Sequence, residues 1–122
     1  MRFSSLVIVS SALVGCGPSP ADEAKVREVK AYLLKVVEAE KRYHAANQTF
    51  SLNMKEISDF DDSLGEPPGG YTVKGGGGLA LAFGYEVRAT PTGAGPHFYV
   101  NQSGVVRSSN WGQADENSDP VE

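Results

Sequence analysis

The spacing of apolar residues changes once along this chain of 122 residues, and that change limits the folds it can adopt. Between residues 22 and 46, apolar side chains recur at intervals of three, four or seven, which is the period of an amphipathic helix. The stripe consists of Val26, Val29, Tyr32, Leu33, Val36, Val37, Ala39 and Tyr43. Asp22 and Glu23 lie in its first turn, where acids suit the helix dipole. The pattern predicts a single helix of roughly 25 residues.

From residue 71 onward the spacing is two, which is the period of a strand that buries one face. Residues 71–73 and 83–89 alternate between apolar and polar side chains, and Phe83 and Tyr85 fall on the apolar side. Residues 97–107 contain a Ser-Gly pair and predict a hairpin, because glycine readily adopts the positive φ of a tight turn. A long helix followed by three to four antiparallel strands is an α+β fold in which the sheet covers the helix.

Turn-forming residues separate these segments. Asn53, with Glu56 three positions later, predicts the cap of a short helix. Residues 59–70 combine acids, prolines and glycines, and predict a loop. The glycines at 75–78 predict a flexible connection between two strands. Residues 112–122 contain four acids and a single branched apolar residue, and they predict a solvated, disordered tail.

The first sixteen residues have the composition of a secretory signal, with Arg2 before about nine mostly apolar residues. That run is too short to span ~30 Å of hydrocarbon as a helix. It ends on Leu13-Val14-Gly15-Cys16, which resembles the bacterial lipoprotein box. The resemblance implies cleavage between Gly15 and Cys16, attachment of diacylglycerol to the Cys16 sulfur, and acylation of the new amino group by a chain such as palmitate.

A lipid anchor sets the expected organisation of the chain. We expect residues 1–15 to be the signal peptide, 16–21 a lipidated tether, 22–111 the folded domain and 112–122 the tail. Two or three acyl chains hold a protein durably on a membrane, whereas one holds it marginally. Gly17 stands where an aspartate would retain such a protein in the inner membrane. In a Gram-negative host the resemblance therefore implies the outer membrane, at its periplasmic face or at the surface.

Charge and cysteine content argue against nucleic-acid binding and against a fold held by a disulfide or a zinc-finger site. The net charge is −4 and Lys and Arg form no cluster, which argues against nucleic acid as a partner. The single cysteine permits neither an internal disulfide nor a zinc-finger site.

The order of segments in the folded domain resembles a known family. Residues 39–50 are similar to the end of the long helix in type IV pilins and type II secretion pseudopilins, and residues 70–73, 85–91 and 98–107 are similar to the strands that follow. The basic leader and the long apolar helix by which pilins polymerise are missing here, and a lipoprotein signal takes their place. The resemblance implies a pilin-like head on a lipid anchor. Its implied role is non-enzymatic contact with another envelope protein, in envelope, pilus or secretion-system organisation.

Few side chains have the chemistry of a catalytic or metal site. His44 and His97 are the two histidines, and neither stands at metal-ligand spacing from another ligand, so both are expected in solvent. A shared metal site stays open as an alternative if the fold brings them together with an acid. Asp59, Asp61 and Asp62 lack the pattern of a calcium loop and are expected to form a charged surface. We assign no catalytic, cofactor-binding or metal-binding residue.

Two aromatic residues are the candidate partner contacts. Tyr99 belongs to the expected hairpin, and Trp111 follows the last strand, where it either closes the core or forms an exposed edge. Lys74, before the glycines at 75–78, lacks the following Ser or Thr and the helix of a phosphate-binding loop. A second hypothesis is a periplasmic solute-binding lipoprotein that holds a small ligand between helix and sheet. A third is metal-assisted catalysis.

Overall fold

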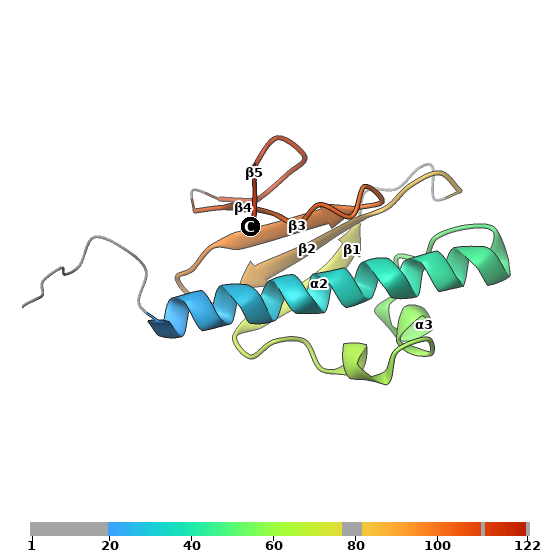
Figure 1. Cartoon of the computed structure of the whole chain (residues 1–122), viewed down its shortest axis with the longest axis horizontal. Coiled ribbons are helices and arrows are strands. Elements are labelled where there is room, and N and C mark those ends of the chain that lie inside the picture. The colour runs from blue at the N-terminus through green and yellow to red at the C-terminus, as the bar shows by residue number, and fades with distance from the viewer. Residues whose placement is uncertain (1–19, 77–81, 111, 122) are drawn as a thin grey trace, which may run out of the picture.

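The computed structural model describes residues 20–76, 82–110 and 112–121. One long helix, α2 (Pro20–Asn47), precedes a short helix, α3 (Met54–Ser58), and a 3-10 turn, η2 (Asp62–Gly65). The strands are β1 (Tyr71–Gly76), β2 (Glu86–Pro91), β3 (His97–Asn101), β4 (Arg107–Ser109) and β5 (Asp119–Pro120). They form one antiparallel sheet in chain order, and α2 runs along it (Figure 1). The predicted α+β fold is confirmed, with five strands in place of three to four.

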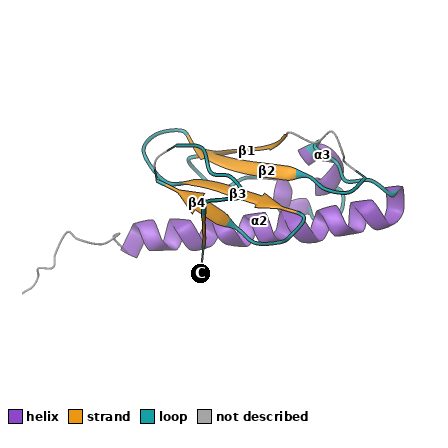
Figure 2. Cartoon of the chain, turned by 90° about the horizontal axis from the view of Figure 1, so that it is seen from above, coloured by secondary structure: helices purple, strands orange, loops and turns teal. Residues whose placement is uncertain are grey.

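Helix α2 lies against one face of the sheet, as the view from above shows (Figure 2). Leu33 and Val36 of α2 are fully buried in one cluster with residues of β2 and β3. Burial alternates along β2, where Val87 and Ala89 are buried and the residues between and beside them are not. The alternating pattern therefore marks a sheet with one apolar face, as predicted.

Helix α3 and turn η2 pack against α2 as a second, smaller layer. The Asn53 side chain caps α3 by accepting a hydrogen bond from the Lys55 N–H at 2.9 Å. The Tyr32 hydroxyl donates to the Leu64 carbonyl oxygen at 2.7 Å, which joins η2 to α2 through a buried bond. The predicted cap is confirmed, and the predicted loop 59–70 contains the η2 turn.

The glycine run is in part a strand and not a connection. Gly75 and Gly76 continue β1, opposite Val87 and Glu86 of β2. A Cβ at Gly75 would lie 2.9 Å from the Leu52 carbonyl oxygen. Glycine is therefore required where β1 passes close to another stretch of backbone. Residues 77 and 78 lie outside the described part of the chain.

Strand β2 begins at Glu86, later than the alternation of residues 83–89 predicts. Tyr85 is buried as predicted, but Phe83 is 82% exposed. The prediction for Phe83 is wrong because Phe83 lies in a turn three positions before β2 begins, where the alternation of a strand does not fix the direction of the side chain.

The predicted disordered tail is wrong for residues 112–121. This segment contains β5, which pairs with β4, and the Val121 N–H donates to the Val106 carbonyl oxygen at 2.7 Å. Ala114 is fully buried. Backbone pairing needs no apolar side chains, so a composition rich in acids does not prevent it.

Candidate functional site

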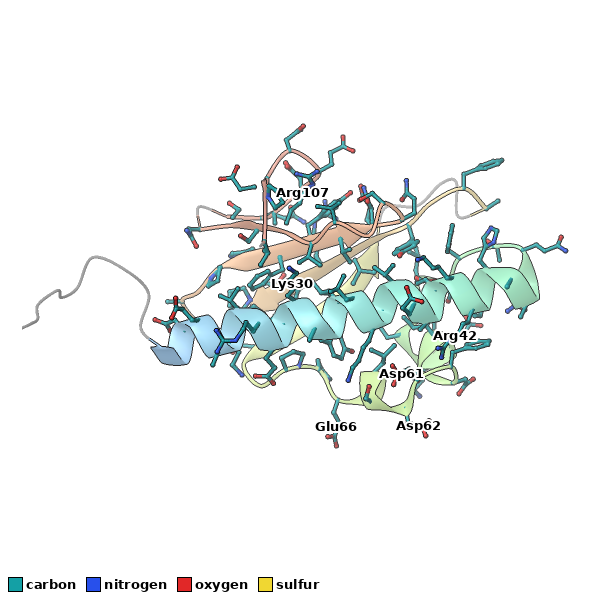
Figure 3. The ribbon with its side chains drawn as sticks, viewed as in Figure 1. Lys30, Arg42, Asp61, Asp62, Glu66 and Arg107 are labelled. Atoms are coloured by element: carbon teal, nitrogen blue, oxygen red, sulfur yellow. The ribbon has the colours of Figure 1, made fainter. Side chains whose placement is uncertain are left out.

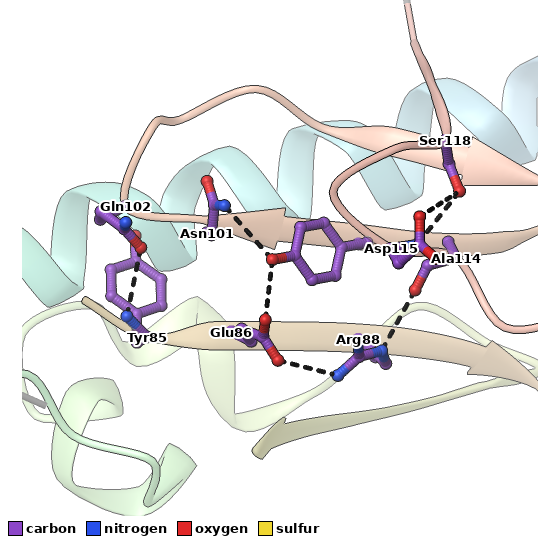
Figure 4. A network of polar contacts seen from close by, with 9 residues as sticks. Tyr85, Glu86, Arg88, Asn101, Gln102, Ala114, Asp115 and Ser118 are labelled. Carbon is purple, nitrogen blue, oxygen red and sulfur yellow. Dashed lines mark hydrogen bonds and ion pairs between the residues drawn. The ribbon is translucent and has the colours of Figure 1, made fainter. Parts of the chain in front are cut away.

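The outer face of the sheet, opposite α2, carries a polar network in which Glu86, Arg88 and Asn101 surround Tyr99 of β3; the first three are labelled in Figure 4. The Tyr99 hydroxyl donates to Glu86 Oε2 at 3.1 Å and accepts from Asn101 Nδ2 at 3.2 Å. The other Glu86 oxygen, Oε1, accepts from Arg88 Nη1 at 3.3 Å. The guanidinium carbon of Arg88 lies 5.1 Å from the centre of the Tyr99 ring, within range of a cation–π contact.

Residues 112–118, which we call the C-terminal cover, lie beside this network. Arg88 Nε donates to the Ala114 carbonyl oxygen at 3.1 Å (Figure 4). On the other side of Tyr99, Arg107 Nη1 donates to the Ser118 carbonyl oxygen at 2.9 Å. The cover is therefore held by two arginines through its backbone, and its acidic side chains take no part in those two bonds.

One predicted contact residue, Tyr99, is not at the surface. Tyr99 is 1% exposed, so the expectation that its side chain meets a partner is corrected. Its ring is buried on the outer face of the sheet, where no element was predicted to lie. Trp111, the second predicted contact, lies outside the described residues.

Cys16 and Gly15, the residues of predicted lipidation and cleavage, also lie outside the described residues. Helix α2 begins at Pro20, four positions after Cys16. None of the helices in the described part of the chain is long and apolar enough to cross a membrane.

An exposed aromatic residue, Phe83, lies in the turn before β2, near the C-terminal end of α2, and its exposure was not predicted from the sequence. His44 Nε2 and the Ala82 carbonyl oxygen are 3.0 Å apart, so the residues that lead into β2 lie beside the last turns of α2 (Figure 1). Phe83, which follows, is the most exposed of the large hydrophobic side chains described. From Pro20 to His44 the helix rises about 36 Å at ~1.5 Å per residue. Phe83 therefore lies near the C-terminal end of α2, whereas the predicted anchor precedes the N-terminal end of that helix.

The other end of α2 borders a groove of about 880 Å³. Val26 and Lys25 of α2 form one wall, and the Lys25 ammonium group pairs with Glu28 at 2.8 Å. Tyr71 and Phe98 of the sheet form part of the other, with ring centres 5.7 Å apart. The groove lies between helix and sheet, and loop residues 69–70 and 92–96 complete its rim.

A buried carboxyl group on α2 also escaped sequence reasoning. Glu40 is fully buried, its Oε1 accepts the Ser51 N–H at 2.9 Å, and its Oε2 has no hydrogen-bond partner in the described structure. Burial raises the pKa of Glu40 to about 7, against the lowering effect of the Ser51 bond. Burial likewise raises the pKa of Tyr85, and the Glu40 charge adds to that shift. Glu40 follows Val36 by four residues and Leu33 by seven, so it lies on the same face of the helix as both. That spacing is the sequence signal that indicates its burial.

His44 and His97 are both partly exposed. The His44 ring lies on Phe50, with ring centres 4.4 Å apart. Across the described residues, no group of three or more His, Cys, Asp or Glu side chains is arranged to hold a metal ion. The structure therefore assembles no metal site around either histidine in the part that it describes.

Of the three acids in residues 59–62, Asp61 caps a turn and the other two are exposed. Asp61 caps η2 by accepting from the Ser63 N–H at 3.0 Å and from the Ser63 hydroxyl at 2.6 Å. Those two hydrogen bonds lower the pKa of Asp61. Asp59 and Asp62 are exposed, and Asp62 points away from the body of the protein (Figure 3).

No protein-family model matches this chain, and comparison with characterised proteins and with solved structures finds no significant match. Arguments about function therefore depend on the residues themselves.

Proposed function

We propose that this chain is a lipid-anchored protein of the bacterial cell envelope, which acts without catalysis by contacting another protein. The lipoprotein box that ends at Cys16 supports the anchor, because its residues and position suit acylation. The order of one long helix and an antiparallel sheet supports the resemblance to a pilin head, and with it a role in envelope, pilus or secretion-system organisation.

The observation that carries the proposal is the placement of Phe83. An 82% exposed phenylalanine is costly to leave in water, and aromatic side chains are enriched at the centres of protein interfaces. The contact between His44 and Ala82 ties the Phe83 backbone to the end of α2 that is remote from Cys16. A partner that contacts Phe83 would therefore bind beside the C-terminal end of α2, the end farther along the chain from Cys16.

A photo-crosslinking side chain placed at position 83 tests this proposal in intact cells. We expect a discrete adduct from position 83 and none from position 34, since Leu34 is also exposed but lies on α2 away from this end. The same experiment with Cys16→Ser should reduce the adduct, because the chain is no longer held at the membrane. Equal adducts from positions 83 and 34, or none from position 83, would reject the contact surface.

The groove at the start of α2 favours a second candidate function, a periplasmic solute-binding lipoprotein. Its volume of about 880 Å³ is in the range of small-molecule sites, and aromatic and aliphatic side chains line it. Mass spectrometry of molecules released from the purified protein tests this candidate. Val26→Trp should fill the groove and abolish the bound species, whereas Val105→Trp, on the surface elsewhere, should retain it.

A further inference from the structure

We propose that the outer face of β1 and β2 binds a phosphate group, free or carried by a lipid, between Lys74, Arg88, Thr72 and Thr90. The register of the two strands places Lys74 directly opposite Arg88, and Thr72 directly opposite Thr90. Side chains in such positions have Cβ atoms about 5 Å apart. Two cations and two hydroxyl groups thus occupy neighbouring positions on one surface.

Strand alternation puts these four side chains on the face away from α2. Val73, Val87 and Ala89, which alternate with them, all belong to or pack on the helix-facing core. A groove of about 440 Å³ lies on this outer face and is lined by the four residues together with Gly75 and Gln113 of the C-terminal cover. The cover reaches this groove with Gln113, whereas Tyr99, on the neighbouring strand, is buried.

Arg88 is held in position for such a ligand. Its Nε bonds to the Ala114 carbonyl, its Nη1 bonds to Glu86, and its guanidinium lies over the Tyr99 ring. A guanidinium has five N–H donors, so these two bonds leave most of them for a ligand. A cation that is already ordered loses less conformational entropy when a ligand binds.

Lys74 has no acidic partner in the described structure that would neutralise it. The nearest acid by register is Glu86, diagonally across from Lys74. Both oxygens of Glu86 are already engaged, Oε1 by Arg88 and Oε2 by Tyr99. Asp115 and Glu116 of the cover are the other acids near this face, and Asp115 bonds within the cover itself.

A like-charge pair directly across two strands destabilises a sheet. Lysine on the edge strand β1 also discourages pairing with another chain, but that effect needs no arginine opposite it. Glu86 pairs with Arg88 and offsets part of its charge, and an anion between Lys74 and Arg88 would offset the remaining repulsion by attracting both side chains. Phosphate carries about −1.5 to −2 charges at neutral pH, so two cations favour it over a singly charged carboxylate.

Titration of the purified full-length chain with inorganic phosphate, followed by NMR, tests the site. We expect saturable shifts of the backbone amides of residues 72–75 and 88–90. Sodium chloride at matched ionic strength should not produce them, and acetate should saturate more weakly. Shifts that grow linearly, or that chloride reproduces, would overturn the proposal.

Three variants separate this site from general charge effects. Lys74→Ala should weaken phosphate binding about tenfold, the size of one charge-assisted hydrogen bond. Thr72→Val with Thr90→Val keeps the charge and should weaken binding about threefold. Lys55→Ala removes an exposed lysine of α3 and should leave the affinity unchanged. Unchanged binding in Lys74→Ala, with the amide spectrum of the folded protein preserved, would also reject the site.

Vesicles distinguish the two sources of phosphate. Phosphatidylcholine vesicles with and without phosphatidic acid, which carries a phosphate monoester, can compete with inorganic phosphate for the Cys16→Ser chain. If only the vesicles that contain phosphatidic acid displace inorganic phosphate, the natural ligand is a lipid headgroup. If inorganic phosphate binds and neither kind of vesicle displaces it, the ligand is a soluble phosphate. Absence of both rejects the site.

Discussion

The two faces of the sheet are built by different physical means. The face toward α2 is a cluster of buried apolar side chains, among them Leu33, Val87 and Val100. Among the residues that the structure describes, the outer face has no such cluster, and the buried Tyr99 lies there beside a hydrogen-bonded carboxylate and the Arg88 guanidinium, which also binds the C-terminal cover. Apolar burial leaves a periodic signal in the sequence, whereas polar contacts to carbonyl oxygens leave none.

The largest expected effect comes from breaking the apolar face. Leu33→Ala should lower the free energy of unfolding by about 3 kcal/mol, through lost burial and the cavity left behind. Leu33 is fully buried on α2, so the neighbouring side chains can relax only in part. Chemical denaturation measures the change. Leu34→Ala is the matched control, because Leu34 is 39% exposed and should cost far less.

Among the described residues, Glu40 is the one fully buried charged group, and its titration should make stability depend on pH. The unfolded chain loses this proton near pH 4.5, whereas the folded protein holds it until about pH 7. Because the folded state then binds more protons, stability falls as pH rises between those values and stays reduced above them.

Glu40→Gln removes that pH dependence while it retains an oxygen that can accept the Ser51 N–H. We expect a gain of about 2 kcal/mol above pH 7, less than the pKa shift alone implies, because the new amide group lacks an acceptor. Denaturation midpoints across pH measure it. Glu38→Gln, on the exposed face of α2, should leave the profile unchanged. If the stability of Glu40→Gln fell with pH as steeply as that of the unchanged protein, this account would be contradicted.

The smallest expected effect on stability comes from the outer face of the sheet, where Arg107 holds the C-terminal cover. Arg107→Ala should lower the free energy of unfolding by about 1 kcal/mol, because it removes one bond to the Ser118 carbonyl. Faster amide exchange confined to residues 112–121 is the specific sign. Arg27→Ala, an exposed arginine of α2, should change neither quantity. Exchange that rises equally throughout the sheet would show that Arg107 does more than hold the cover.

The candidate sites were less accessible to sequence reasoning than the fold. Phe83 continued the alternation of Tyr85 and Val87 in sequence, but the strand begins only at Glu86, so its side chain is exposed. Tyr99 was predicted at the surface because nothing in an acidic C-terminal segment indicates that it will pair with β4. Both errors concern which backbone pairs with which, and a local pattern does not contain that information.

The sequence by itself determined the long helix, the strand alternation, the Asn53 cap and the layered α+β architecture. These follow from local periodicity and turn chemistry, which act over a few residues. Only the tertiary structure decided that Tyr99 is buried, that Phe83 is exposed, and that Lys74 faces Arg88. Those three facts depend on strand register and on contacts between residues distant in the chain, whose energies arise only after the chain has folded.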